Sequence, residues 1–208
     1  MIGTVLQHLV SSRGKRRPAF ARRALGCSMH ERRVTDIALR FFDLLQPIHR
    51  LSGRHRDVLR LAALVHDCGR RFGARDHHIS GAQLVIQDKL LQLSPRERRS
   101  VAYLVRYHCG KVPSLARSEY LRDKDRPRKV RLLLAMLRAA DGLDSRRVSA
   151  TAIIVKRKDR RLRVQCWVDS TQMEKARKAF LRRRKYKLLE RSLDLDVSVR
   201  LGELLTPQ

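Results

Sequence analysis

A chain of 208 residues, 43% of them hydrophobic, is long enough to bury a sizeable core and too apolar to be disordered. Its 48 Lys and Arg residues outnumber 20 Asp and Glu residues, and the net charge of +28 favours polyanionic partners such as nucleic acid, anionic membranes, polyphosphate or phosphorylated nucleotides. No apolar run approaches the roughly 20 residues of a membrane span, and aromatic residues, at 5%, do not indicate a platform for stacking bases.

The chain is expected to lie in a reducing compartment. Its four cysteines are far apart and form no CxxC pair, which argues against both a disulfide framework and a structural zinc site. The first ten residues are too short, and lack the cleavage region, for a secretory signal. We therefore predict a cytoplasmic protein.

Two helices are predicted near the start of the chain. Proline opens a short helix over residues 18–25. Ser28 then caps a longer helix over residues 29–45, which ends before Pro47. Apolar residues recur along this second helix at spacings of three and four, and His30 falls on the same stripe, one turn ahead of them.

The next predicted helix begins near His55 and ends abruptly in His66 and Asp67, with Gly69 as the stop signal. The preceding run, residues 61–65, is small and aliphatic, as in a buried helix. An inward-facing carboxylate must be paired, protonated or bound to a cation, because an unsatisfied buried charge is costly. An imidazole beside a carboxylate suits a divalent metal. Such dipeptides also arise by chance on solvated surfaces.

Three more helices follow before the pattern changes. The helix predicted over residues 77–90 begins with two adjacent histidines. The next one opens with a capping box at residues 94–97, and its apolar stripe continues to His108. A charged loop leads to a helix over residues 129–141, whose apolar face includes Asp141.

Beyond Ser149 the sequence predicts strands and a single basic helix. The strands are expected over residues 151–155, 162–168 and 193–199, and the helix over residues 171–191. The fold class is therefore mainly α, a helical bundle with a small C-terminal α+β segment in the order strand-strand-helix-strand. Three parts are predicted: an N-terminal extension (1–14), a helical domain (15–148) and a basic α+β segment (149–208).

Several helices thus turn polar residues towards the core. His30, His108 and Asp141 lie on apolar stripes, and another helix ends in the pair His66 and Asp67. A single inward histidine is usually a hydrogen-bonded core residue. Imidazoles and carboxylates that converge from facing helices are, however, the means by which helical bundles build metal centres.

The order of these residues resembles the HD-domain metal-dependent phosphohydrolase superfamily. Its four core ligands are matched by His30, His66, Asp67 and Asp141. The two additional histidines of its two-metal members are matched by His77 and His108. The spacing from His77 to Gly81 and Ala82 matches the superfamily's His-xxx-Gly-Ala pattern, although a shift of one residue would select His78 instead.

A closer resemblance covers nearly the whole chain. Four segments are similar to the C-terminal half of the exopolyphosphatase/guanosine pentaphosphate phosphohydrolase family: RRALGCSMHERRV (22–34), ALRFFDLL (38–45), LVRYH (104–108) and LRAADGLD (137–144). In those enzymes catalysis belongs to an N-terminal actin-like ATPase half with glycine-rich phosphate loops. This sequence contains no such half, so that activity is not carried over, and a separate ATPase-like chain stays open as a partner.

The resemblance implies hydrolysis of a phosphate-rich anionic substrate such as polyphosphate or a nucleotide polyphosphate. Asp67 would be the catalytic residue that bridges two divalent metal ions, with His30, His66 and Asp141 on one ion and His77 and His108 on the other. Mixed nitrogen and oxygen ligands favour Mn, Fe, Co or Zn over Mg. Two such ions activate a water and stabilise an in-line displacement at phosphorus. Cys68 and Cys109 each follow a candidate ligand and are interpreted as buried, inert thiols.

Cationic side chains near the ligands are candidates for binding phosphate oxygens. They are Arg33, Arg70, Arg71, Arg75, Lys111 and Arg138. Each of them is alternatively a solvated surface charge.

A hypothesis of another class is a non-catalytic module that binds polyphosphate or nucleic acid. The basic helix over residues 175–191, with its run Arg182-Arg-Arg-Lys185, favours it, although such a run is also typical of a solvated helix face. Metal content separates the two hypotheses, because a polyanion-binding surface needs no transition metal. A homo-oligomer is compatible with both.

Overall fold

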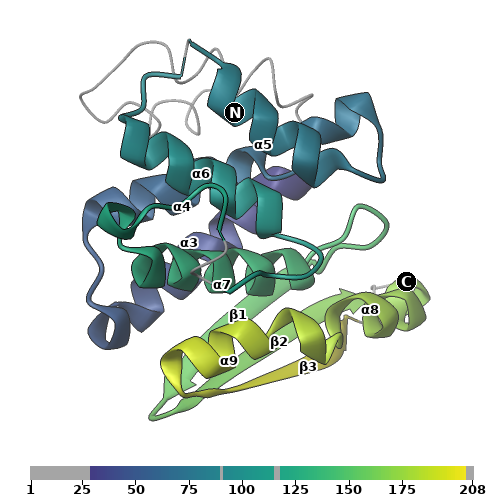
Figure 1. Ribbon diagram of the computed structural model, residues 1–208. Helices are drawn as coiled ribbons and strands as arrows, with labels where there is room; N and C mark the ends of the chain where they lie inside the picture. Colours follow the sequence, from purple (N-terminus) through teal and green to yellow (C-terminus); the bar gives the residue numbers. More distant parts are fainter. Residues whose placement is uncertain (1–28, 90, 115–117, 205–208) are drawn as a thin grey trace.

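The computed structural model describes residues 29–89, 91–114 and 118–204 (Figure 1). The short helix predicted over residues 18–25, the predicted cap Ser28 and the predicted extension over residues 1–14 lie outside these ranges. Within these ranges the first five α-helices pack against one another, and a small sheet lies in the C-terminal part of the chain. The prediction of a mainly α chain with a small C-terminal α+β segment is confirmed. The predicted boundary between residues 148 and 149 stays a prediction.

Five α-helices form the first part of the described chain. They are α3 (Met29–His49), α4 (Gly53–Val65), α5 (His77–Gln87), α6 (Pro95–Tyr107) and α7 (Pro127–Gly142). Two 3-10 turns, η1 (Cys68–Phe72) and η3 (Asp123–Asp125), lie in the connections. The capping box predicted at residues 94–97 is present, because Ser94 Oγ accepts from the Glu97 amide and the Glu97 carboxylate accepts from the Ser94 amide.

The prediction that the first long helix ends before Pro47 is wrong. Helix α3 continues through Pro47 to His49. The His49 side chain supports this last turn, since its Nε2–H donates to the Phe42 carbonyl at 2.8 Å and its Nδ1 accepts from the Leu51 amide at 2.9 Å. A proline so close to a helix end removes few backbone hydrogen bonds, and the helix can therefore continue through it.

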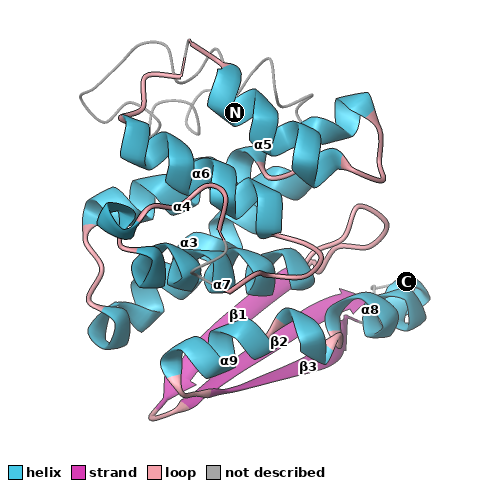
Figure 2. Cartoon of the chain, in the orientation of Figure 1, coloured by secondary structure: helices cyan, strands magenta, loops and turns pink. Residues whose placement is uncertain are grey.

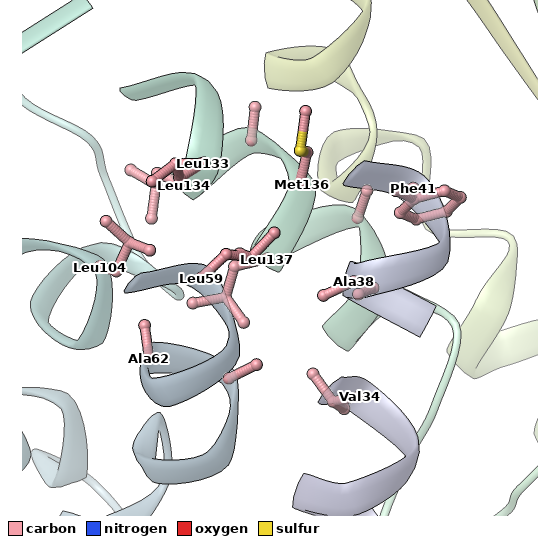
Figure 3. Packing of buried hydrophobic residues seen from close by; sticks show 14 of the residues in the cluster. Val34, Ala38, Phe41, Leu59, Ala62, Leu104, Leu133, Leu134, Met136 and Leu137 are labelled. Carbon is pink, nitrogen blue, oxygen red and sulfur yellow. The ribbon is translucent and has the colours of Figure 1, made fainter. Parts of the chain in front are cut away.

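The core lies between α3, α4, α6 and α7. Figure 3 shows Val34, Ala38 and Phe41 of α3 facing Leu59 of α4 and Leu137 of α7, and all five are fully buried. These are the apolar positions that recur at helical spacing in the sequence, so periodicity alone orients the helices. None of the helices in the described part of the chain is long and apolar enough to cross a membrane.

The C-terminal segment is a three-stranded sheet with helices on one face (Figure 2). Its strands are β1 (Ala152–Lys158), β2 (Arg161–Asp169) and β3 (Asp196–Leu204). Strand β1 pairs antiparallel with β2, and β2 pairs parallel with β3. The crossover from β2 to β3 contains α8 (Met173–Phe180) and α9 (Lys187–Leu193), which cover the face where Leu162 and Val164 are buried.

The prediction of one basic helix over residues 171–191 is wrong. The chain forms a 3-10 turn, η5 (Arg183–Lys185), between α8 and α9. Tyr186 explains the break, because its buried hydroxyl hydrogen bonds with the carbonyls of Phe180 and Gly142. Contacts with α7 thus override a local sequence that favours an unbroken helix. The third strand consequently begins at Asp196, three residues later than predicted, after Asp194 ends α9 in the left-handed region at φ 50°.

Candidate metal centre

The six predicted metal ligands come from the ends of helices that converge on one point. His30 lies in the first turn of α3, His66 caps α4 and Asp67 follows it. His77 begins α5 and His108 caps α6. Asp141 lies in the last turn of α7. Five helices that pack around a common core therefore bring together residues that are separated by up to 111 positions in the sequence.

Asp67 lies between two groups of potential ligands. One group is His30, His66 and Asp67, and the other is Asp67, His77 and His108. The Asp67 Oδ1 atom lies 3.1 Å from His77 Nε2 and 3.5 Å from His108 Nε2, whereas Oδ2 lies 3.9 Å from His30 Nε2. His66 Nε2 of the first group lies 3.9 Å from Oδ1, and Oδ2 also accepts from Arg70 and Arg146. The buried carboxylate of Asp67 thus lies between the two groups.

Asp141 completes the first of these groups. Its Oδ1 atom lies 3.6 Å from His30 Nε2 and 3.7 Å from His66 Nε2. The first position is therefore surrounded by two imidazoles and two carboxylates, and the second by two imidazoles and the shared carboxylate of Asp67.

All four imidazoles are held in the same way, by a hydrogen bond at Nδ1. His66, His77 and His108 each donate to the carbonyl three residues earlier, those of Ala63, Ala74 and Val105, at 2.7 Å. His30 Nδ1 instead donates to the Asp144 carboxylate at 2.6 Å. A carbonyl only accepts, so Nδ1 carries a hydrogen and Nε2 is the nitrogen that faces inward. With Nε2 deprotonated, this is the tautomer that a metal-binding histidine needs.

The inward nitrogens then face one another in pairs. His30 Nε2 lies 3.3 Å from His66 Nε2, and His77 Nε2 lies 3.2 Å from His108 Nε2. Two neutral imidazoles in this tautomer would oppose lone pair to lone pair. Such an arrangement is stable only with positive charge in each pair, supplied by a proton or by a cation. The chemistry of the donor set therefore fits divalent metal ions.

The protonation equilibria agree with a demand for positive charge. Burial lowers the pKa of His108, but hydrogen bonds with Asp67 and Cys109 outweigh it and raise the pKa to about 10. Hydrogen bonds with the same two residues raise the pKa of His77 to about 9. Burial lowers the pKa of the fully enclosed His66 to about 4. Burial lowers the pKa of His30, but hydrogen bonds with Asp141 and Asp144 outweigh it and raise the pKa to about 9. Both imidazoles of the pair His77 and His108, and His30 of the other pair, are thus strongly basic.

The carboxylates are correspondingly acidic. Burial raises the pKa of Asp67, but hydrogen bonds from His108 and His77 outweigh it and hold the pKa well below its usual range. Burial also raises the pKa of Asp141, but the Lys185 ammonium and the hydrogen bond with His30 together with the nearby imidazoles outweigh it and hold the pKa well below its usual range. Both groups are therefore ionised at neutral pH, as metal ligands must be.

Cys109 differs from the inert thiol that was predicted. It lines the same cavity as the histidines and forms a third potential ligand group with His77 and His78. Burial raises its pKa, but hydrogen bonds from His108 and His77 outweigh it and lower the pKa to about 5. Cys68, by contrast, is buried with a pKa raised to about 12, mainly by burial, as an inert thiol would be. The structure places His77, rather than His78, against Asp67.

The predicted phosphate-binding cations are placed differently. A cavity of about 410 Å³ opens at the ligands, and only Arg70 of the six lines it, with its Nε donating to Asp67 Oδ2 at 2.5 Å. Arg33 donates to Asp144 at 2.7 Å, and Arg138 donates to the backbone carbonyls of Tyr107 and Gly110. The remaining three predicted cations are exposed and do not line the cavity: Arg71, Arg75 and Lys111.

Other cations line the cavity in their place. Arg146 Nη2 donates to Asp67 Oδ2 at 2.9 Å and also pairs with Glu31, and Lys185 pairs with Asp141. Arg147 and Arg182 lie at the same cavity. The sequence did mark Arg182 and Lys185 as members of a basic run, but nothing in it indicated that they reach the helical centre. Asp144, which holds His30, could have been noticed as a second carboxylate three residues after Asp141.

Comparison with known proteins agrees with this architecture. A family model described as Ppx/GppA phosphatase, domain III, matches residues 28–194. No curated protein matches the chain.

Proposed function

Because the chain belongs to the Ppx/GppA phosphatase domain III family, we propose that it is a metal-dependent phosphohydrolase of the HD type. Its substrate would be a phosphate-rich anion such as polyphosphate or a nucleotide polyphosphate. The family relation is to exopolyphosphatase-type phosphohydrolases, and the proposal goes further in assigning the activity to this chain and to the histidine and aspartate cluster.

One observation carries the proposal. The buried Asp67 carboxylate lies between two pairs of histidines, and the inward Nε2 atoms of each pair lie 3.3 Å and 3.2 Å apart. Divalent ions held by these residues would lower the pKa of a bound water and neutralise charge on phosphoryl oxygens. Asp67, His30, His66 and Asp141 fit one ion, and Asp67, His77 and His108 fit the other.

Residues around these ligands would orient His30 and bind the phosphate groups of the substrate. Asp144 keeps the His30 ring in its tautomer and orientation by accepting from Nδ1. Arg147 and Arg182 line the cavity, and neither forms an ion pair within the described ranges of the chain. Guanidinium groups of this kind bind phosphate oxygens in bidentate fashion. They would orient an anionic substrate against the ligand cluster.

The donor set also bears on the kind of metal. Imidazole nitrogens equal the carboxylates in number at the first position and outnumber them at the second, and the Cys109 thiol lies beside the second. Nitrogen and sulfur donors favour Mn, Fe, Co or Zn over Mg, which prefers oxygen ligands. Cys109 adds a soft donor that the predicted ligand set did not contain.

An activity assay tests the proposal. The purified protein, supplied with Mn²⁺ or Co²⁺, should release phosphate from polyphosphate, nucleotides or guanosine tetraphosphate. Asp67→Ala should abolish this release, whereas Asp43→Ala, which removes an exposed carboxylate paired with Arg56, should not. Absence of turnover with every substrate, or turnover that survives Asp67→Ala, would contradict the proposal.

The second candidate is a non-catalytic module that grips polyphosphate or nucleic acid through the basic segment 175–191. The exposed side chains of Arg182, Arg183 and Arg184 support it. Binding through this segment should weaken steeply with salt and be lost on charge reversal across residues 182–185. Affinity that survives this change would exclude it.

A further inference from the structure

The outer face of the sheet is separate from the metal centre. Helices α8 and α9 cover the face on which Leu162, Val164 and Cys166 are buried, and the connection between them carries Arg182 and Lys185 to the cavity at the metal centre. Side chains alternate along a strand, so the intervening residues of β2 point to the opposite face. That face is hollowed by a second cavity of about 590 Å³, whose lining includes Ile154, Lys156, Arg163, Trp167 and Arg200.

Five cations occupy this outer face. They are Lys156, Lys158, Arg161, Arg163 and Arg200. All five are exposed, and none forms an ion pair within the described ranges. Carboxylates on this face lie at the ends of the strands. Asp196 begins β3 and is the cross-strand partner of Arg161, and Asp169 is the last residue of β2.

The pairing of these cations is unfavourable for the sheet itself. Lys156 is the direct cross-strand partner of Arg163, and Lys158 is the partner of Arg161. Like charges directly opposite one another destabilise a sheet. A bound polyanion would offset this repulsion, because each phosphate placed over such a pair attracts both side chains.

Trp167 lines the same cavity and lies close against the backbone of the neighbouring strand. Its cross-strand neighbour on β3 is Gly202, where an added Cβ would lie 3.0 Å from the Trp167 Cδ1 and Nε1 atoms. The glycine therefore lets the indole lie close against the neighbouring strand. The Trp167 side chain is half-buried, and Trp167 is the single tryptophan of the chain. Phosphate-binding cations beside a supported indole are the two elements of a surface for unpaired bases.

We propose that this face binds single-stranded nucleic acid, with phosphates on the paired cations and a base stacked on Trp167. A duplex keeps its bases stacked internally, and polyphosphate or an anionic membrane has none to offer. The indole thus selects single strands among the polyanions that the charge alone would attract. This surface is independent of the ligand cluster, from which the sheet and the α8–α9 layer separate it.

The intrinsic fluorescence of the single tryptophan reports on this site directly. Titration of the protein with a short single-stranded oligonucleotide should quench it, and the anisotropy of the labelled oligonucleotide should rise in parallel. The logarithm of the affinity should fall with that of the salt concentration, with a slope of about −0.7 for each neutralised phosphate. Polyphosphate or duplex that displaces the single strand at equal concentration would overturn the proposal.

Variants locate the site. Lys156→Glu with Arg163→Glu should weaken binding about tenfold or more, because two phosphate contacts become repulsive. Trp167→Ala should weaken it about 5- to 150-fold, and Trp167→Phe, which keeps an aromatic ring, by less. The matched control is Lys124→Glu with Arg128→Glu, the same charge change at exposed residues of η3 and the start of α7. Loss of binding in that control, with binding intact in the sheet variants, would overturn the proposal.

A last experiment distinguishes nucleic-acid binding at the sheet from activity at the proposed metal centre. Asp67→Ala, or a chelator, should leave oligonucleotide binding unchanged, whatever it does to phosphate release. Binding that requires Asp67 or metal would place the nucleic acid at the cavity and contradict the assignment to the sheet. Should the double charge reversal fail to fold by circular dichroism, Lys156→Gln with Arg163→Gln removes the charges more gently and should still weaken binding.

Discussion

At the scale of single residues, the carboxylate of Asp144 fixes the orientation of His30, a proposed metal ligand, without being a proposed ligand itself. It is buried, and it accepts from His30 Nδ1 at 2.6 Å and from Arg33 Nε at 2.7 Å. Arg33 balances its charge and fixes its orientation, so Asp144 in turn fixes the imidazole. Partners of this kind orient a metal ligand and raise its basicity.

Replacement of Asp144 by asparagine should therefore weaken metal binding without changing a metal ligand. The amide keeps the shape of the side chain but loses the charge that holds both His30 and Arg33. We expect about a 10- to 100-fold loss of metal affinity, measured by competition with a chromophoric chelator. Asp43→Asn, at an exposed aspartate, should leave the affinity unchanged. Equal affinities for Asp144→Asn and the unaltered protein would refute this positioning role.

The sequence predicted residues on regular helices better than residues beside them. His30 and Asp141 fall on apolar stripes, so helical periodicity indicates their direction. Asp144 and Arg146 follow the end of α7, where no periodic pattern applies. Their positions depend on how the loop after α7 returns across α3, which is a tertiary property.

At the scale of elements, close backbone contact between η1 and α5 positions two ligands at once. Asp67 directly precedes η1, and His77 begins α5. A Cβ added at Gly69 would lie 2.0 Å from the His77 carbonyl oxygen and 2.5 Å from the Gly81 amide nitrogen. Because both atoms belong to the backbone, they cannot move aside without shifting α5 itself.

Gly69→Ala should accordingly lower both stability and metal affinity. Overpacking costs about 1–3 kcal/mol and sometimes more, and the displaced α5 would carry His77 away from Asp67. Gly53→Ala is the matched control, since an added Cβ there meets nothing within 4 Å. Urea unfolding of both variants, with and without metal, gives the comparison. A stable Gly69→Ala protein with unaltered metal affinity would show that this contact is not needed.

The ion pair between α6 and η3 predicts a dependence of stability on pH. Asp125 is buried and accepts from Arg99 Nε at 2.7 Å, from Arg99 Nη2 at 2.6 Å and from the Arg122 amide at 2.9 Å. The Arg99 hydrogen bonds hold the pKa of Asp125 below its usual range. The folded pKa is thus below the unfolded value of about 3.9. This contribution to stability is present above that value and is lost as the pH falls through the folded pKa.

Asp125→Asn should remove this acid-sensitive contribution. At pH 7 we expect a loss of about 1–3 kcal/mol in the free energy of unfolding, because charge-assisted hydrogen bonds are replaced by weaker ones. Between about pH 5 and about pH 3 the variant should lose less stability than the unaltered protein. Parallel unfolding curves that keep a constant separation at all pH values would disprove the assignment to Asp125.

Element prediction failed where distant contacts decide. The run from Leu181 to Lys185 contains no proline or glycine, so local sequence favours a continuous helix. The break occurs because Tyr186 packs against α7 and hydrogen bonds with Gly142. Gly142 itself permits this approach, since an added Cβ would lie 2.8 Å from Lys185 Cβ.

At the scale of the whole molecule, the C-terminal segment and the helical bundle share one cavity. Helix α7 packs against α9, and Lys185 of the intervening turn pairs with Asp141. Net charge predicted an attraction for polyanions, but it could not predict that the cations divide between a cavity with metal-binding chemistry and the outer face of a sheet. That division follows from strand alternation and from the broken crossover helix.

Metal analysis of the purified protein tests the central claim most directly. Elemental analysis after reconstitution with Mn²⁺, Co²⁺ or Zn²⁺ and removal of free metal should find close to two ions per chain, and Asp67→Ala, which removes the shared carboxylate, should retain far less. A protein that keeps no transition metal under these conditions, or that keeps as much without Asp67, would contradict the claim that the converging imidazoles and carboxylates form a metal centre.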